Sequence, residues 1–118
     1  FSTYNVHGRS YTAQDLTAIA LRQALFGTPA PEGLLSLSGG IGDPLSRIPM
    51  GLTAETFRAI AELLITETLL ETGRASRVDR VLISPRGPDG RRVLVEWAEP
   101  LANGNHGATQ TIDGYIQG

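Results

Sequence analysis

Apolar residues recur at helical spacing in two stretches of this chain of 118 residues. Within residues 13–26, Leu16, Ile19 and Ala20 fall on one face of a helix, with polar side chains on the other. Thr12 precedes the stretch and is a residue type that caps helix amino ends. The pattern predicts a helix over residues 13–26.

A second and stronger helical pattern covers residues 54–72. Thr53 can cap its amino end, and Gly73 can end it in the left-handed conformation that glycine tolerates. We expect its apolar face to consist of Phe57, Ile60, Ala61, Leu64 and Leu70, widened by Leu63 and Leu69. The solvent side would carry Glu55, Arg58, Glu62 and Thr66. Arg58 and Glu62 could pair weakly along this side.

After the second helix the period changes from helical to alternating. Residues 77–84 and 91–98 are rich in β-branched side chains and are joined by a Pro- and Gly-rich turn, which predicts a β-hairpin. The inner face would carry Val81, Ile83, Val93, Val95 and Trp97. The pattern predicts an α+β fold in which two helices pack on a small antiparallel sheet, with residues 13–101 as the single domain.

The two ends of the chain show neither the helical nor the alternating pattern of apolar residues. Residues 1–12 are predicted to form an extended amino-terminal arm, and residues 102–118 an extended carboxy-terminal tail. The tail is small, polar and rich in glycine until Ile112, Tyr115 and Ile116. Two interpretations stay open for it: a frayed end, or a strand donated to the sheet edge of a partner.

All ten basic residues are arginines, against twelve acidic ones, for a net charge of −2. Six of the arginines lie in residues 74–92, where only two aspartates oppose them. Clustered arginines can bind carboxylates or phosphates bidentately, although a coding bias towards arginine explains the absence of lysine more simply. Trp97 is the only aromatic residue near this segment, so the stacking residues of a nucleic-acid surface are missing and nucleic-acid binding is disfavoured.

The chain offers little material for catalysis. It contains no Cys and only two His, and its carboxylates occur without a recognisable partner acid. We therefore expect no catalytic residues, no metal site and no cofactor. No apolar run approaches the length of a membrane span, and the first ten residues lack the basic start and apolar middle of a signal peptide.

Three segments together resemble a known family. They are Gly51–Phe57, Glu71–Val78 and Val93–Val95, with Ala20–Gly27 as a weaker fourth match. Their order resembles that of the small baseplate wedge proteins of contractile-tailed phages, a family that includes sheath-initiator subunits and a Mu-type branch. The good match spans residues 53–97, under half of the chain.

The resemblance implies a structural subunit of the virion's tail baseplate, assembled in the host cytoplasm, that binds other wedge subunits and the tail sheath protein. In much of the family a Glu-Pro-Arg triplet precedes the first strand, and its Arg docks on a neighbouring wedge subunit. Here Ala75-Ser76-Arg77 occupies that place, so the Arg is present while the Glu and Pro are absent, as in the Mu-type branch. The family's hairpin sheet also offers an edge to which the first sheath ring adds strands.

From the arginine cluster, the resemblance at Arg77 and the apolar residues of the tail, we expect the partner-binding residues to be Arg74, Arg77, Arg80, Ile112, Tyr115 and Ile116. No nucleic acid, membrane or small-molecule substrate is expected as a partner. The alternatives are another phage tail or connector adaptor, or a small bacterial regulatory binding domain, with a hydrolase third.

Overall fold

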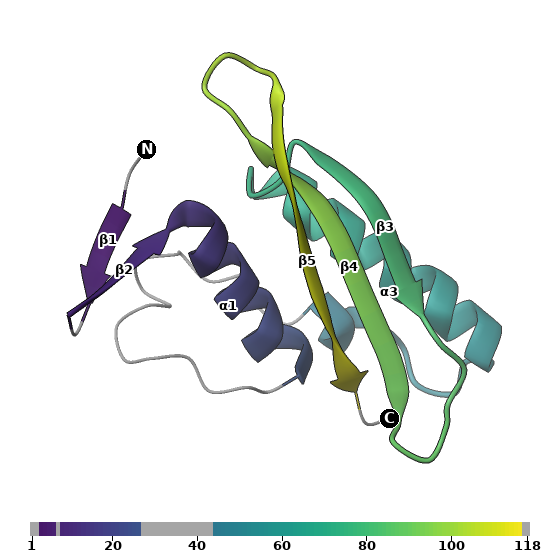
Figure 1. The fold of residues 1–118 in the computed structure, drawn as a ribbon. Helices are drawn as coiled ribbons and strands as arrows, with labels where there is room; N and C mark the ends of the chain where they lie inside the picture. Colours follow the sequence, from purple (N-terminus) through teal and green to yellow (C-terminus); the bar gives the residue numbers. More distant parts are fainter. Residues whose placement is uncertain (1–2, 7, 27–43, 117–118) are drawn as a thin grey trace.

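A three-stranded antiparallel sheet with two helices on one of its faces forms the body of the molecule (Figure 1). The computed structural model describes residues 3–6, 8–26 and 44–116. The sheet consists of β3 (Arg77–Ile83), β4 (Arg91–Pro100) and β5 (His106–Ile116), in the order β3-β4-β5. The helices are α1 (Ala13–Phe26) and α3 (Ala54–Glu71), with a short 3-10 helix, η1 (Pro44–Arg47), beside α3. The predicted α+β architecture is confirmed.

The start of α1 follows from a reciprocal pair of hydrogen bonds. The Thr12 backbone N–H donates to Asp15 Oδ2 at 2.8 Å, and the Asp15 N–H donates to Thr12 Oγ1 at 3.1 Å. These bonds satisfy amide groups that the helix itself leaves unpaired. Leu21 and Leu25 then bury their side chains in the core between α1 and the sheet.

The predicted bounds of α3 are close to those observed. The Thr53 hydroxyl accepts a hydrogen bond from the Thr56 N–H at 3.2 Å, and Gly73 follows the helix with a φ of 72°. The predicted ion pair is wrong, because Arg58 pairs with Glu55 and not with Glu62. A spacing of three residues towards the amino end competes with the spacing of four that we expected.

The predicted apolar face of α3 is correct at Ala61 and Leu69 but differs from the observed face by about a quarter turn of the helix. The buried positions are Ala61, Ile65, Thr68 and Leu69. Leu63 and Leu70, assigned to the core from the sequence, are instead 56% and 44% exposed. The leucine-rich sequence contains two overlapping apolar stripes, and packing against β3 and β4 selects the one centred on Ile65.

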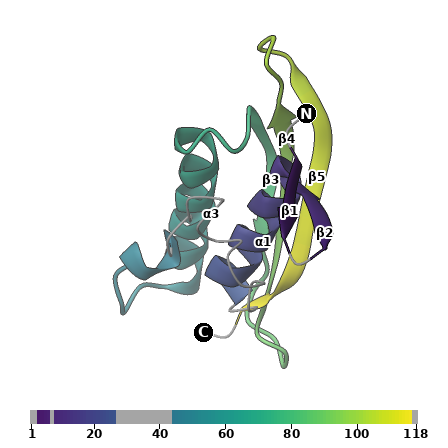
Figure 2. The ribbon, with the colours of Figure 1, turned by 90° about the vertical axis from the view of Figure 1, so that its left-hand side faces the viewer.

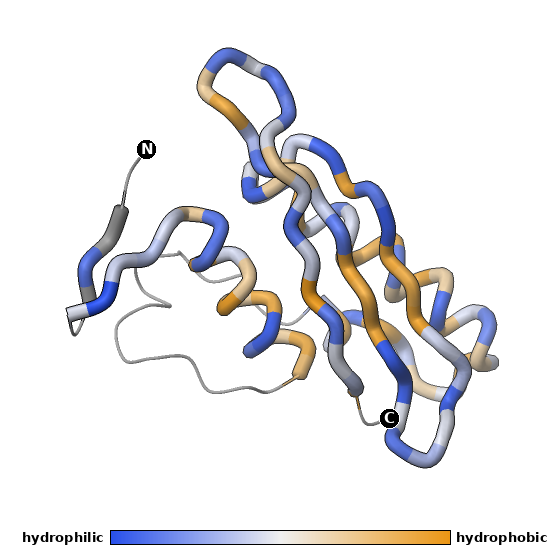
Figure 3. The backbone as a smooth tube through the Cα atoms, in the orientation of Figure 1, coloured by the Kyte–Doolittle hydropathy of each residue, from blue (hydrophilic) through white to orange (hydrophobic). Residues whose placement is uncertain are grey.

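The inner face of the sheet is the one predicted for the hairpin, extended by the third strand. Val93, Val95 and Trp97 of β4 are fully buried, and Ile83 of β3 is nearly so. These residues form one cluster with the buried side chains of both helices. Apolar residues run along β3, β4 and α3 in Figure 3, and the side view in Figure 2 shows α3 and the sheet as two layers.

The carboxy-terminal tail is the main correction to the predicted organisation. Residues 106–116 form β5, which pairs with β4 along almost its whole length. Ile112 and Ile116 are 1% and 6% exposed and belong to the core cluster. The segment is therefore an internal strand of the domain, neither a frayed end nor a strand available for donation.

The amino-terminal arm is extended, as predicted, but it pairs with itself. β1 (Thr3–Val6) and β2 (Arg9–Thr12) form a two-stranded antiparallel ribbon that leads directly into α1. The ribbon forms a sheet separate from that of β3, β4 and β5.

Candidate partner-binding surface

The face of the sheet that points away from the helices bears three rows of side chains across the strands. Strand register aligns Arg80 with Glu96 and Thr111, then Leu82 with Leu94 and Asp113, then Arg92 with Tyr115. Leu82 is 47% exposed and Tyr115 53% exposed. A face that combines exposed large apolar side chains with charged ones is typical of protein–protein contact surfaces.

Ion pairs neutralise most of the arginines on this face. Arg80 Nε lies 3.1 Å from Glu96 Oε1 directly across the strands, and Arg77 pairs with Asp79 on its own strand. Arg92 binds Asp113 through two hydrogen bonds, which raises the pKa of Arg92 and lowers the pKa of the Asp113 carboxyl. Three of the six arginines in residues 74–92 are therefore already paired with carboxylates.

Arg91 lies on the inner side of β4, away from this face. It is only 8% exposed, and its guanidinium carbon lies 5.2 Å from the ring centre of Phe57 on α3. A cation over an aromatic face is stabilised by the charge distribution of the ring. Arg91 therefore helps to hold α3 against the end of the sheet.

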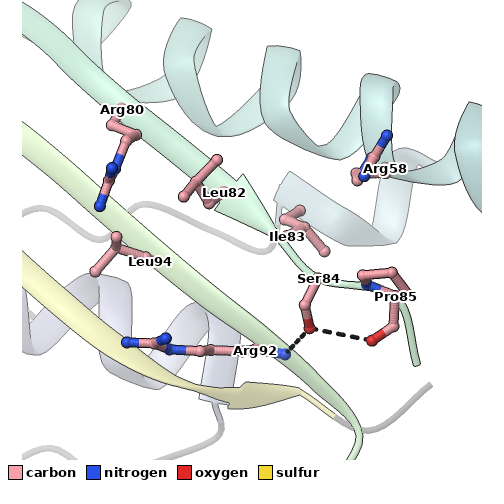
Figure 4. Close-up of a pocket in the computed structure, with 8 residues that line it drawn as sticks. All are labelled: Arg58, Arg80, Leu82, Ile83, Ser84, Pro85, Arg92 and Leu94. Atoms are coloured by element: carbon pink, nitrogen blue, oxygen red, sulfur yellow. Dashed lines mark hydrogen bonds between the residues drawn. The ribbon is translucent and has the colours of Figure 1, made fainter. Parts of the chain in front are cut away.

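A hollow of about 340 Å³ lies around the end of β3, lined by side chains of the outer face together with Ile83 and with Arg58 of α3 (Figure 4). Leu82 and Leu94 form its apolar centre, and Arg80 and Arg92 lie on either side of them. Ser84 closes one end, where its hydroxyl accepts a hydrogen bond from the Arg92 N–H at 2.8 Å.

The two outer edges of the sheet differ in their backbone. The Arg92 N–H and C=O both face β3, since they bond to Ser84 Oγ and to the Ser84 N–H. Backbone groups alternate in direction along a strand, so the residues next to Arg92 face β5. In the observed pairing of β4 with β5, the β5 residues whose N–H and C=O groups point away from β4 are Thr109, Thr111, Asp113 and Tyr115.

This edge of β5 is regular from Thr109 to Ile116, and within the described ranges no strand pairs with it. The opposite edge, on β3, is interrupted by a β-bulge between Val78 and Arg80. Bulges disturb the ladder and disfavour the addition of another strand. The edge of β5 therefore has the more regular backbone of the two, and α1 and β2 lie near it at Gln110 and Thr111, where the three elements line one hollow.

The predicted site residues divide into three groups. Arg77, Arg80 and Tyr115 are exposed on or beside the outer face, as a partner contact requires. Ile112 and Ile116 are in the core, and their assignment to a partner is wrong.

Arg74 lies apart from the outer face, in the link between α3 and β3. It is partly buried there, and burial lowers the pKa of its guanidinium. The structure therefore does not bring Arg74 together with Arg77 and Arg80 as one exposed group.

Several residues of this surface were not among the predicted site residues. Leu82, Leu94 and Arg92 line the hollow, and Asp113 holds Arg92 in place. The signal for two of them was present, because alternation in residues 91–98 already directs Arg92 and Leu94 away from the inner face. The position of Asp113 depends on the pairing of β5, which the sequence pattern does not predict.

One serine–histidine contact has the residue types of a catalytic pair. Ser76 Oγ lies 2.7 Å from His106 Nδ1, but it is also within 3.3 Å of the Glu99 carbonyl oxygen, where it ties the start of β3 to the end of β4. Among the described residues no carboxylate bonds to His106, so the third group of a triad is missing. The contact joins the residue before β3 to the end of β4 and the start of β5.

Groups of three or more metal-ligating side chains do not occur in the part of the chain that the structure describes. Its helices are also too short or too polar to cross a membrane. No protein-family model matches the sequence, and comparisons with curated proteins and with solved structures found no match.

Proposed function

We propose that the chain is a structural subunit of a contractile phage tail baseplate, a wedge protein that helps connect the baseplate to the tail sheath. The observation that carries this proposal is that the helices cover only one face of the sheet. Its outer face exposes Leu82 and Tyr115 among ion-paired side chains, and among the described residues no strand pairs with the outer edge of β5. A subunit that acts by assembly needs such surfaces and no catalytic centre.

The segments that resemble the wedge family support the proposal by their placement. Gly51–Phe57 leads into α3, Glu71–Val78 links α3 to β3, and Val93–Val95 is the centre of the sheet. Arg77, the residue that matches the family's docking Arg, is exposed at the start of β3. Strand addition by the sheath would take place on the edge of β5, because the β3 edge carries the bulge.

Locating the chain in purified tails tests the proposal. A short epitope inserted at Asn103–Asn105, in the exposed connection between β4 and β5, leaves both strands intact. We expect the tagged chain to co-purify with contractile tails at a fixed copy number, and immunogold labelling to mark the baseplate end. A chain that stays entirely in the unassembled fraction would contradict the proposal, provided that the tagged protein melts like the untagged one.

A further inference from the structure

A second hollow, of about 380 Å³, lies where β2 and α1 come close to the outer edge of β5 (Figure 2). We call it the α1–β5 hollow. One stripe of α1, with residues at intervals of three and four positions, lines it together with residues of β2 and β5. Most of the lining side chains are polar, and its apolar members are Ala18, Ile19 and the ring of Tyr11. A lining of this kind favours a polar ligand.

Two arginines line the α1–β5 hollow, and neither has a carboxylate partner. Arg9 lies on β2 and Arg22 on α1, and both are exposed. Within residues 3–6, 8–26 and 44–116, neither of them takes part in an ion pair. The arginines of the outer sheet face differ in this respect, because Arg80 and Arg92 are both paired. The N–H donors of Arg9 and Arg22 are therefore available to a carboxylate from outside.

Among the described residues that line the hollow, Asp15 is the one carboxylate, and it already has a partner. Its Oδ2 accepts a hydrogen bond from the Thr12 N–H at 2.8 Å, at the start of α1. Two arginines and one aspartate leave the lining with a net charge of +1, in a chain whose net charge is −2. The hollow is therefore a positive site on an acidic protein, and it attracts anions.

Gln14 adds a fixed hydrogen-bond donor to the hollow. Its side chain is buried, and its Oε1 accepts a hydrogen bond from Trp97 Nε1 at 3.0 Å. Because the indole N–H can only donate, this bond identifies the amide oxygen and leaves Nε2 for another partner. Nε2 has no partner among the described residues, and no enclosed side-chain nitrogen of those residues lacks one. Nε2 is therefore accessible from the hollow that Gln14 lines.

We propose that the α1–β5 hollow binds an acidic side chain of a partner protein, whose carboxylate pairs with Arg9 and Arg22 and accepts a hydrogen bond from Gln14 Nε2. A free small carboxylate fits less well, because both arginines are exposed and small-molecule sites bury most of their ligand. A protein also meets the edge of β5, where Thr111 lines the hollow and points its backbone N–H and C=O away from β4. The inference rests on this hollow and does not depend on the proposed function.

NMR titration of the isolated protein tests the site. The probe is N-acetylglutamate methylamide, which carries one side-chain carboxylate between two peptide groups, and its glutamine analogue is the neutral control ligand. The side-chain amide signals of Gln14 and the indole N–H signal of Trp97 report binding in the hollow. We expect the glutamate probe to shift these signals with a dissociation constant of about 1–10 mM, and the binding to weaken as salt is added.

Two double variants assign the binding to the hollow. Arg9→Gln/Arg22→Gln removes the proposed carboxylate partners and should raise the dissociation constant at least about tenfold. Arg47→Gln/Arg86→Gln is the matched control and should leave it unchanged, because it removes the same charge from exposed residues outside the hollow. Thermal melting first establishes that each variant keeps its fold, and the single variants Arg9→Gln and Arg22→Gln replace the first pair if it melts early.

Three results would overturn the proposal: no shift of the Gln14 signals at about 50 mM probe, equal shifts with the glutamine analogue, or equal weakening in both double variants. Glutarate, a free dicarboxylate, separates the two sources of a carboxylate. If it binds more than about tenfold tighter than the probe, the hollow belongs to a small molecule and the assignment to a partner protein is wrong. Binding of glutarate no tighter than the probe supports the partner protein.

Discussion

Ile65 shows how one side chain decides the orientation of a helix. It is fully buried, whereas Leu63, two residues earlier on α3, is 56% exposed. We predict that Ile65→Ala lowers the free energy of unfolding by about 2–5 kcal/mol, because it opens a cavity beneath the sheet. Leu63→Ala should cost less than about 0.5 kcal/mol. Chemical denaturation of both variants measures the difference, and equal losses would mean that the helix packs by another face.

The buried contact between Trp97 and Gln14 is a second point at which one side chain holds two elements together. Trp97 Nε1 donates to Gln14 Oε1 at 3.0 Å, and both residues are buried. Gln14→Ala leaves the indole N–H without its partner, so we predict a loss of about 1–3 kcal/mol in unfolding free energy. The control is Gln23→Ala on the exposed side of the same helix, which should cost less than about 0.5 kcal/mol. A similar loss for both would point to helix propensity as the cause.

Asp113 gives the outer face a dependence on pH. The hydrogen bonds from Arg92 lower the pKa of its carboxyl in the folded protein. A carboxyl with a lowered folded pKa stabilises the fold at pH values above its unfolded pKa, and this contribution is lost as the pH falls through the folded pKa. We predict that Arg92→Gln raises the pKa of Asp113, measured by NMR titration, while Arg58→Gln leaves it in place. No change in Arg92→Gln would mean that the ion pair does not form in solution.

At the scale of elements, local chemistry predicted most of the boundaries. Hydroxyl caps at Thr12 and Thr53 fix where the helices begin, and the Pro- and Gly-rich turn fixes the hairpin. The sequence pattern did not predict β5, because one of the inner positions of this strand is Gly114. A Cβ at this position would lie only 2.9 Å from the Phe26 ring. The ring at the end of α1 supplies the apolar bulk that a strand normally carries itself. No alternation of apolar residues was therefore visible.

The direction of backbone groups on β5 predicts an alternating pattern of hydrogen exchange. Amides of Gln110, Ile112, Gly114 and Ile116 face β4 and should be strongly protected, whereas those of Thr111, Asp113 and Tyr115 face outward and should exchange faster. Amide exchange followed by NMR on the isolated protein gives the pattern residue by residue. Uniformly fast exchange over residues 109–116 would mean that β5 is not paired in solution, and uniformly slow exchange would mean that its edge is covered.

At the scale of the whole molecule, Arg77 separates folding from assembly. It is exposed, and its ion pair is with Asp79 on the same strand, so Arg77→Ala should change the free energy of unfolding by less than about 0.5 kcal/mol. If the role implied by the wedge family holds, the same variant should fail to enter tail particles. Melting and incorporation measured on one preparation decide this. Asp79→Ala is the matched control, since it breaks the same ion pair but keeps the arginine.

The sequence predicted less of the partner surface than of the fold, and the reason is geometric. Alternation along one strand shows which side chains point outward, but the rows that join Leu82 to Leu94 and Arg92 to Tyr115 exist only once three strands are in register. Arg80 and Tyr115 were predicted as partner residues from charge and from position in the tail. The structure adds Leu82, Leu94 and the carboxylates that neutralise the arginines.

The bulge at Asp79 has a consequence for how the sheet can grow. Val78 and Val81 are three residues apart, and a regular strand places residues at an odd spacing on opposite faces. The extra residue of the bulge, Asp79, shifts the alternation so that both valines pack against the core. Deleting Asp79 would keep Val78 opposite Trp97 and Arg80 opposite Glu96, but it would straighten the edge into a regular template. The sheet would then accept a strand on either side. With Asp79 in place, the bulge disfavours strand addition at β3 and leaves the regular edge of β5 as the favoured place for an added strand.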